Sequence, residues 1–148
     1  SIDINVDAHI PESYIQNQEQ RIDAYKKIAA IEEESDIYDI EEEFTDRYGD
    51  LPVPLKNVME ISLIKSMAEK IKISEISQKE ENIVLKFSGK ELPMEKIAAA
   101  ISEYKGKLLF SAGEVCYLTL KQKGINVTVR KSIHKMLNKE VKNYGYYS

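Results

Sequence analysis

The residues best suited to chemistry are carboxylates that crowd one stretch, residues 35–52. Carboxylates on the two sides of a cleft can act as general acid and base, and a loop of oxygen ligands can hold calcium. This stretch instead has helical periodicity, which turns one side acidic and the other apolar and creates neither a cleft nor a calcium loop. The acidic side holds Asp39, Glu42, Glu43 and Asp46, and the apolar side holds Ile37, Ile40, Phe44 and Tyr48.

Two interpretations of the acidic side are open at this point. It is either a solvated helix face, which is the common role of such charges, or a surface that binds a positively charged partner. The helix itself is well delimited: Ser35 or Asp36 can cap its start, and Gly49 can take a left-handed conformation at its end.

The sequence contains no other motif that indicates catalysis, a cofactor site or a metal site. The sequence has no Gly-rich loop ending in Gly-Lys-Ser/Thr and no Gly-x-Gly-x-x-Gly, so we expect no ATP site in these residues. His9 and His134 are far apart and lack a neighbouring ligand at metal-binding spacing. Cys116 lies in an apolar run, where a small buried thiol is the usual explanation.

Length and charge bound the class of protein. The chain has 148 residues and a net charge of -4, which is enough for one domain with a real core. Residues 1–51 hold fifteen acids and four bases, and residues 52–148 hold ten acids and seventeen bases. This acidic balance argues against a dedicated DNA-binding protein.

Cellular location is predicted from what the sequence lacks. The lone Cys116 suits a reducing compartment, and there is neither an apolar run long enough to span a membrane nor a signal peptide. We therefore expect a cytoplasmic protein. The chain starts at Ser1 without an initiator Met, which predicts a fragment of a longer protein.

The first half of the chain predicts three helices. Alternation over residues 2–6 indicates a short strand without an evident partner, and apolar spacing predicts helices over about 12–33, 35–49 and 53–70. The apolar positions of the first helix are Ile15, Ile22, Tyr25, Ile28 and Ala29. Those of the third are Val58, Ile61, Ile64 or Lys65, Met67 or Ala68, and Ile71.

The second half predicts a hairpin, a helix, a second hairpin and a last helix. Pro93 opens the first of these helices and Gly106 stops it. Because strands and helices do not alternate regularly, the predicted fold class is α+β with a mostly antiparallel four-stranded sheet, in a single domain over residues 1–148. The predicted strands cover residues 73–77, 83–87, 108–110 and 115–120.

The last helix is basic and is followed by tyrosines. This mixture is typical of nucleic-acid surfaces, although a solvated helix with a loose tail is the commoner explanation of such a pattern. The candidate nucleic-acid contacts are Arg130, Lys131, Lys135 and Lys139.

Several segments resemble one family. Residues 2–4, 7–15 and 21–28, and the run Asp46-Arg47-Tyr48-Gly49-Asp50-Leu51-Pro52, are similar to the C-terminal domain of the bacterial transcription-repair coupling factors (Mfd). The similarity is specific through about Ile71 and is a matter of element order beyond it. The resemblance implies a regulatory domain of an ATP-dependent DNA translocase that dislodges stalled RNA polymerase and recruits the repair protein UvrA.

The resemblance also implies a binding partner for the acidic helix. The family's terminal domain packs on a UvrB-like N-terminal module of the same protein and hides the UvrA-binding surface until polymerase is engaged. The family's contact acids fall on Glu43 and Asp46, with Asp39 and Glu42 beside them on the predicted face, opposite arginines of the other module. The resemblance thus implies autoinhibition by protein interaction, without catalysis or cofactor in this domain.

Overall fold

A computed structural model describes residues 2–89 and 91–121 of the chain. The described residues form an α+β fold, which confirms the predicted class, and the chain separates into two compact units. The helical unit covers Val6–Ser66, and the described part of the sheet unit combines residues 2–5 with residues 67–89 and 91–121. The predicted single domain stays a prediction.

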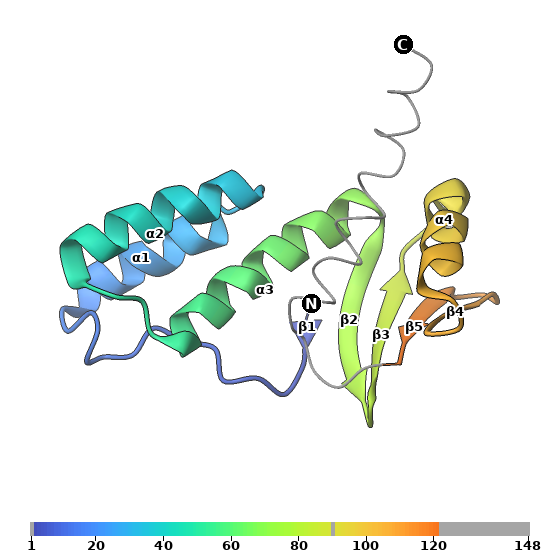
Figure 1. The fold of residues 1–148 in the computed structure, drawn as a ribbon, viewed down its shortest axis with the longest axis horizontal. Helices are drawn as coiled ribbons and strands as arrows, with labels where there is room; N and C mark the ends of the chain where they lie inside the picture. Colours follow the sequence, from blue (N-terminus) through green and yellow to red (C-terminus); the bar gives the residue numbers. More distant parts are fainter. Residues whose placement is uncertain (1, 90, 122–148) are drawn as a thin grey trace, which may run out of the picture. The chain divides into compact units, whose positions relative to one another are not determined.

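The helical unit is built from a helical hairpin and most of a third helix. α1 (Gln18–Ala29) and α2 (Glu34–Tyr48) run antiparallel and lie side by side (Figure 1). α3 (Val53–Lys70) starts in this unit, and its Ser62 hydroxyl donates a hydrogen bond of 2.6 Å to the Ile28 carbonyl oxygen of α1. The three predicted helices are therefore present.

The predicted bounds of the first helix were wrong. Asn17 caps α1 by accepting a hydrogen bond of 3.0 Å from the Gln20 N–H, so the helix begins at Gln18 and not near residue 12. Residues ahead of it form a separate turn in which the Pro11 carbonyl accepts the N–H groups of Tyr14 and Ile15. The Asn17 side chain thus satisfies one of the free N–H groups at the start of the helix, a start that was predicted to follow Pro11.

The predicted buried face of α1 was also partly wrong. Ala24 and Ile28 are its buried residues, whereas Ile22 and Tyr25 are 46% and 37% exposed. Ala29 is exposed as well. The Tyr25 hydroxyl is nevertheless used, because it accepts a hydrogen bond of 2.8 Å from the Ile10 N–H.

α2 begins and ends close to its predicted bounds, but its start is capped differently from the prediction. Glu33 occupies the N-cap position, and the Asp36 carboxylate accepts hydrogen bonds from the N–H groups of Glu33 and Glu32 at 3.0 and 2.9 Å. Of the two predicted capping residues, Asp36 therefore binds N–H groups at the helix start from a position inside the helix. Ser35 does not occupy the N-cap position. Gly49 ends the helix with a φ of 91° and a ψ of -166°, which is positive φ outside the left-handed helical region.

α3 follows its predicted bounds, and its predicted apolar face is partly right, because Ile64, Met67 and Ile71 are buried. Leu55, Met59 and Leu63 are buried, and Val58 and Ile61 are only half-buried. Lys65 is exposed and Ile64 is buried, which decides between those two positions. The helix is apolar around most of its circumference, so its periodicity alone does not select a face.

Among the described residues the sheet has five strands, whereas four were predicted. Their order is β1-β2-β3-β5-β4, and every neighbouring pair is antiparallel except β1 and β2, which are parallel (Figure 1). β1 is the short N-terminal strand, whose partner the sequence left open. The strands are β1 (Ile2–Asp3), β2 (Ile73–Lys79), β3 (Asn82–Phe87), β4 (Leu108–Ser111) and β5 (Tyr117–Leu120).

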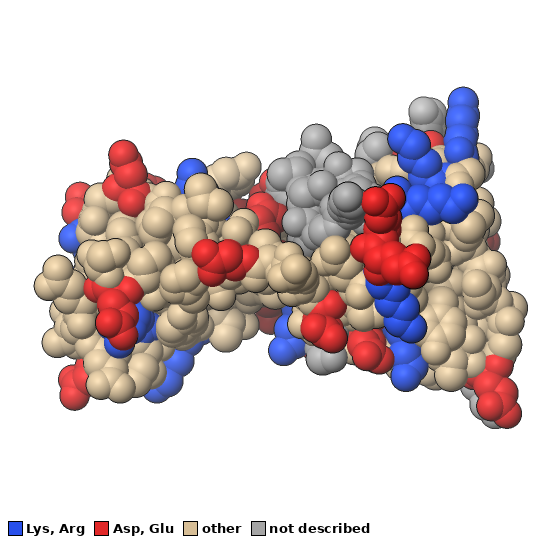
Figure 2. All heavy atoms as spheres, turned by 90° about the horizontal axis from the view of Figure 1, so that it is seen from below, with Lys and Arg blue, Asp and Glu red and all other residues tan. Residues whose placement is uncertain are grey.

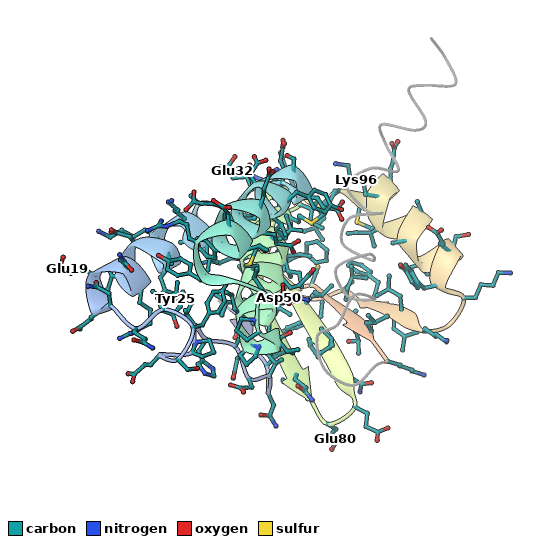
Figure 3. All side chains as sticks on the ribbon, turned by 60° about the vertical axis from the view of Figure 1, so that its left-hand side comes forward. Glu19, Tyr25, Glu32, Asp50, Glu80 and Lys96 are labelled. Atoms are coloured by element: carbon teal, nitrogen blue, oxygen red, sulfur yellow. The ribbon has the colours of Figure 1, made fainter. Side chains whose placement is uncertain are left out.

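Alternation along the strands gives the sheet one apolar face. Register places Ile76 opposite Leu85, and Leu85 opposite Leu118, and all three are buried. α4 (Met94–Tyr104) packs against β4 and buries Ile97 and Ala100. The labelled Glu80 lies at the tip of the β2–β3 hairpin (Figure 3).

Candidate interaction surface on α2

The four predicted carboxylates share one side of α2, as their positions i, i+3, i+4 and i+7 require. Asp39, Glu42 and Asp46 are exposed, and Glu43 is half-buried. The opposite side of the helix buries Ile37 and Phe44. The predicted division of α2 into an acidic and an apolar side is therefore present in the structure.

Glu43 differs from the other three acids because the domain already pairs it. Its Oε2 atom lies 2.5 Å from Lys27 Nζ of α1 and 3.5 Å from Arg47 Nη1, one turn further along α2. The hydrogen bond from Lys27, more than the charge of Arg47, holds the pKa of Glu43 below its ordinary value of 4.5. Within residues 2–89 and 91–121, Asp39, Glu42 and Asp46 take part in no salt bridge.

A groove lies between α1 and α2 beside this pair. Its volume is about 280 Å³, and Ala24 and Phe44 contribute apolar side chains to its wall. The charged and polar residues of the wall carry both signs, so the groove is neither an anion site nor a simple acidic pocket. They are Gln20, Asp23, Lys26, Lys27, Glu43, Arg47 and Tyr48.

Aromatic side chains fix the C-terminal end of α2. The Tyr14 ring lies 5.6 Å from that of Tyr48, which in turn meets Phe44 edge-on at 6.0 Å. The Tyr14 hydroxyl donates to the Gly49 carbonyl oxygen at 2.7 Å and lies 3.2 Å from that of Phe44. Burial, and secondarily the Asp50 carboxylate, raises the pKa of Tyr14 above its ordinary value.

Arg47 shows how this surface holds a guanidinium group. Its Cζ atom lies 5.0 Å from the centre of the Tyr48 ring, and its Nη1 atom faces the Glu43 carboxylate. A planar cation is therefore placed between an aromatic ring and a carboxylate, which is a favourable arrangement for arginine. Elsewhere too, acidic and basic side chains are interspersed on the molecular face in Figure 2.

The sequence analysis missed Lys27 as a member of this site. The contact between Glu43 and Arg47 follows from their spacing of four on a helix, but Lys27 belongs to another helix, 16 residues away. Only the pairing of α1 with α2 brings it to Glu43. Arg130, Lys131, Lys135 and Lys139, the predicted nucleic-acid contacts, lie outside the described residues.

The remaining chemical candidates are not assembled into a site. His9 Nδ1 lies 2.9 Å from Asp7 Oδ1, and the half-buried Cys116 has its sulfur 4.0 Å from the Gly113 carbonyl oxygen. In the part of the chain that the structure describes, no three His, Cys, Asp or Glu side chains are grouped to hold a metal. No helix in that part is both long and apolar enough to cross a bilayer.

The model of the TRCF domain family matches residues 4–97, which include α1, α2 and α3. The chain belongs to the transcription-repair coupling factor family. It is 30% identical over 135 residues to a transcription-repair-coupling factor of Staphylococcus haemolyticus, and 32% identical over 120 residues to one of Staphylococcus aureus. These alignments cover 88% and 81% of this chain.

The coupling-factor chain is also similar to a solved structure, the crystal structure of a C-terminal domain of a transcription-repair coupling factor. The TM-score is 0.82 at 22% identity, and the match covers 93% of this chain and 91% of the other, which shows the same fold. The two Staphylococcus relatives are much longer, since the matched part covers 11% and 10% of them. This chain therefore corresponds to about a tenth of such a coupling factor.

Proposed function

We propose that this chain is a non-catalytic regulatory domain, which binds another module of the same coupling factor through the acidic side of α2. The exposed row of Asp39, Glu42 and Asp46, opposite a firmly buried helix side, carries this proposal. Three carboxylates without an internal ion pair in the described residues remain available to a basic surface. A solvated helix face has the same pattern, so binding to a basic partner is the observation that separates the two interpretations.

The resemblance to the family supplies the identity of the partner. The proposed partner is the UvrB-like N-terminal module, whose arginines would face Glu43 and Asp46. In that position the domain would cover the UvrA-binding surface until the parent protein, an ATP-dependent DNA translocase in the cytoplasm, engages stalled RNA polymerase. Contact with DNA would be made through the parent.

A contact made of exposed charges suits a cover that has to open. Exposed ion pairs contribute about 0 to 1 kcal/mol each and are screened by salt, so a few of them hold a module without locking it. A partner that binds the open form better can then shift the population. The acidic side of α2 offers such a surface, whereas the apolar side is occupied by the domain's own core.

Affinity measurements with isosteric variants test the proposal. Glu43→Gln with Asp46→Asn should weaken binding to the N-terminal module about three- to tenfold, because two exposed ion pairs together contribute about 1 kcal/mol. Glu19→Gln with Glu80→Gln is the matched control, because it removes two outward-pointing carboxylates from other elements (Figure 3). Equal affinities for the two double variants, with unchanged circular dichroism, would contradict the proposal.

The proposed masking of the UvrA-binding surface has to be tested in the full-length parent protein. In the full-length coupling factor, the Glu43 and Asp46 double variant should capture more UvrA than the parent sequence does, because the cover opens more often. The control double variant should capture the same amount as the parent sequence. Increased UvrA capture by both, or by neither, would argue against a masking role.

A further inference from the structure

The ion pair at Glu43 occupies the atom that a binding partner would need. Lys27 Nζ and Arg47 Nη1 both contact Oε2, and Lys27 makes the shorter contact at 2.5 Å. An arginine binds a carboxylate best through two parallel hydrogen bonds, one to each oxygen. An oxygen atom accepts about two such bonds, so a guanidinium that arrives at Glu43 can form both of its own bonds only if Lys27 or Arg47 leaves Oε2. Of these two cations, Lys27 makes the shorter contact and comes from another helix.

The surroundings of Glu43 favour arginine as the arriving group. The groove beside it has a volume of about 280 Å³ and includes the rings of Phe44 and Tyr48. Guanidinium groups stack on aromatic rings and are weakly hydrated, unlike the ammonium group of lysine. The domain's own Arg47 already uses Tyr48 and Glu43 in this manner.

We propose that Lys27 is an internal competitor, which holds Glu43 in the free domain and has to be displaced by an arginine of the partner. This inference rests on the proposed function for the identity of the partner. The displacement of one exposed cation by another is close to balanced, since both states contain a screened ion pair. Lys27 therefore lowers the affinity of the contact and makes it easier to reverse.

The competition predicts an effect larger than the loss of one positive charge alone would produce. Lys27→Met removes a positive charge from the domain and should tighten binding to a basic partner about three- to tenfold. Lys26→Met is the matched control, because Lys26 is the adjacent residue, lines the same groove and forms no salt bridge with the described residues. Both variants change the net charge equally, so Lys26→Met should change affinity by less than about twofold, because it reduces charge repulsion but releases no carboxylate.

A double-variant cycle locates the effect at Glu43. In a Glu43→Gln background, Lys27→Met should have no more effect than Lys26→Met, because there is no carboxylate left to release. A surplus effect of Lys27→Met that persists without Glu43 would overturn the proposal. So would equal affinities of the two lysine variants in the parent background.

A small probe makes the test independent of the partner module. N-acetyl-arginine methylamide can be titrated into the chain while the Glu43 carboxyl carbon is followed by NMR. The Lys27→Met variant should respond at a several-fold lower probe concentration than Lys26→Met, and equal responses would overturn the competition. If the Glu43 and Asp46 double variant leaves module binding unchanged, the proposed function fails, and the probe alone then decides the role of Lys27.

Discussion

The two sides of α2 are made by one helix, but they depend on different forces. On the apolar side, Phe44 and Ile37 are 1% and 6% exposed, and their contribution comes from burial and close packing. On the acidic side, Asp39, Glu42 and Asp46 stand in solvent, where charge interactions are weak and sensitive to salt. Stability and the proposed binding therefore depend on opposite sides of the same helix.

This difference has a practical consequence for a regulatory domain. Substitutions on the acidic side can tune a contact without unfolding the domain, because no core residue shares that side. Glu43 is the intermediate case, since its carboxylate is 39% exposed and contacts two cations of the domain itself. The comparison is sharpened by three substitutions that should fall in a definite order of stability loss.

Truncation of Phe44 should have the largest effect. Phe44→Ala removes a fully buried ring and leaves a cavity, so it should lower the free energy of unfolding by about 3 to 5 kcal/mol and lower the melting temperature. Tyr38→Ala is the control on the same helix, because Tyr38 is 60% exposed and should cost within about 0.5 kcal/mol. Similar melting temperatures for the two variants would mean that the sides of α2 are assigned the wrong way round.

Loss of the Tyr14 hydroxyl should have an intermediate effect. Tyr14→Phe keeps the ring against Tyr48 and removes the hydrogen bond to the Gly49 carbonyl oxygen, so it should cost about 0.5 to 1.5 kcal/mol in urea unfolding. Tyr38→Phe is the isosteric control at an exposed position. An equal midpoint for both variants would show that the end of α2 is held by ring packing alone.

The part of this architecture that the sequence predicts well is local. The two sides of α2 follow from periodicity within one helix, and the β2–β3 hairpin follows from two apolar runs around a polar turn. The start of α3 follows from Pro52 and Pro54, and its apolar face is predicted in part. In each case the determining residues are within a few positions of one another.

The part that the sequence does not predict depends on residues far apart in the chain. The pairing of Ile2 with Ile76 adds a parallel fifth strand, and no local signal identifies a partner 74 residues away. Lys27 reaches Glu43 only after α1 and α2 have packed together. The error at the start of α1 is of a different, local kind. Both Pro11 and Asn17 are suited to precede a helix, and α1 begins after Asn17, whose side chain accepts a hydrogen bond from the Gln20 N–H.

The smallest of the three effects is a pH dependence at Glu43. Because Lys27 lowers the folded-state pKa of Glu43 below 4.5, the ionised carboxylate stabilises the fold. This contribution, about 0 to 1 kcal/mol for an exposed pair, is complete above the unfolded pKa and is lost as pH falls through the lowered folded pKa. The difference in unfolding free energy between the parent sequence and Glu43→Gln should therefore be larger at pH 6 than at pH 3.

Glu42→Gln separates this effect from a general loss of negative charge. Glu42 is the neighbouring acid on α2, is exposed and forms no salt bridge with the described residues, so its substitution should show less dependence on pH. Unfolding in urea at both pH values measures the two differences. Equal pH dependence for the two variants would mean that Lys27 does not hold Glu43 in solution, and the acidic side of α2 would then consist of four equivalent, freely solvated carboxylates.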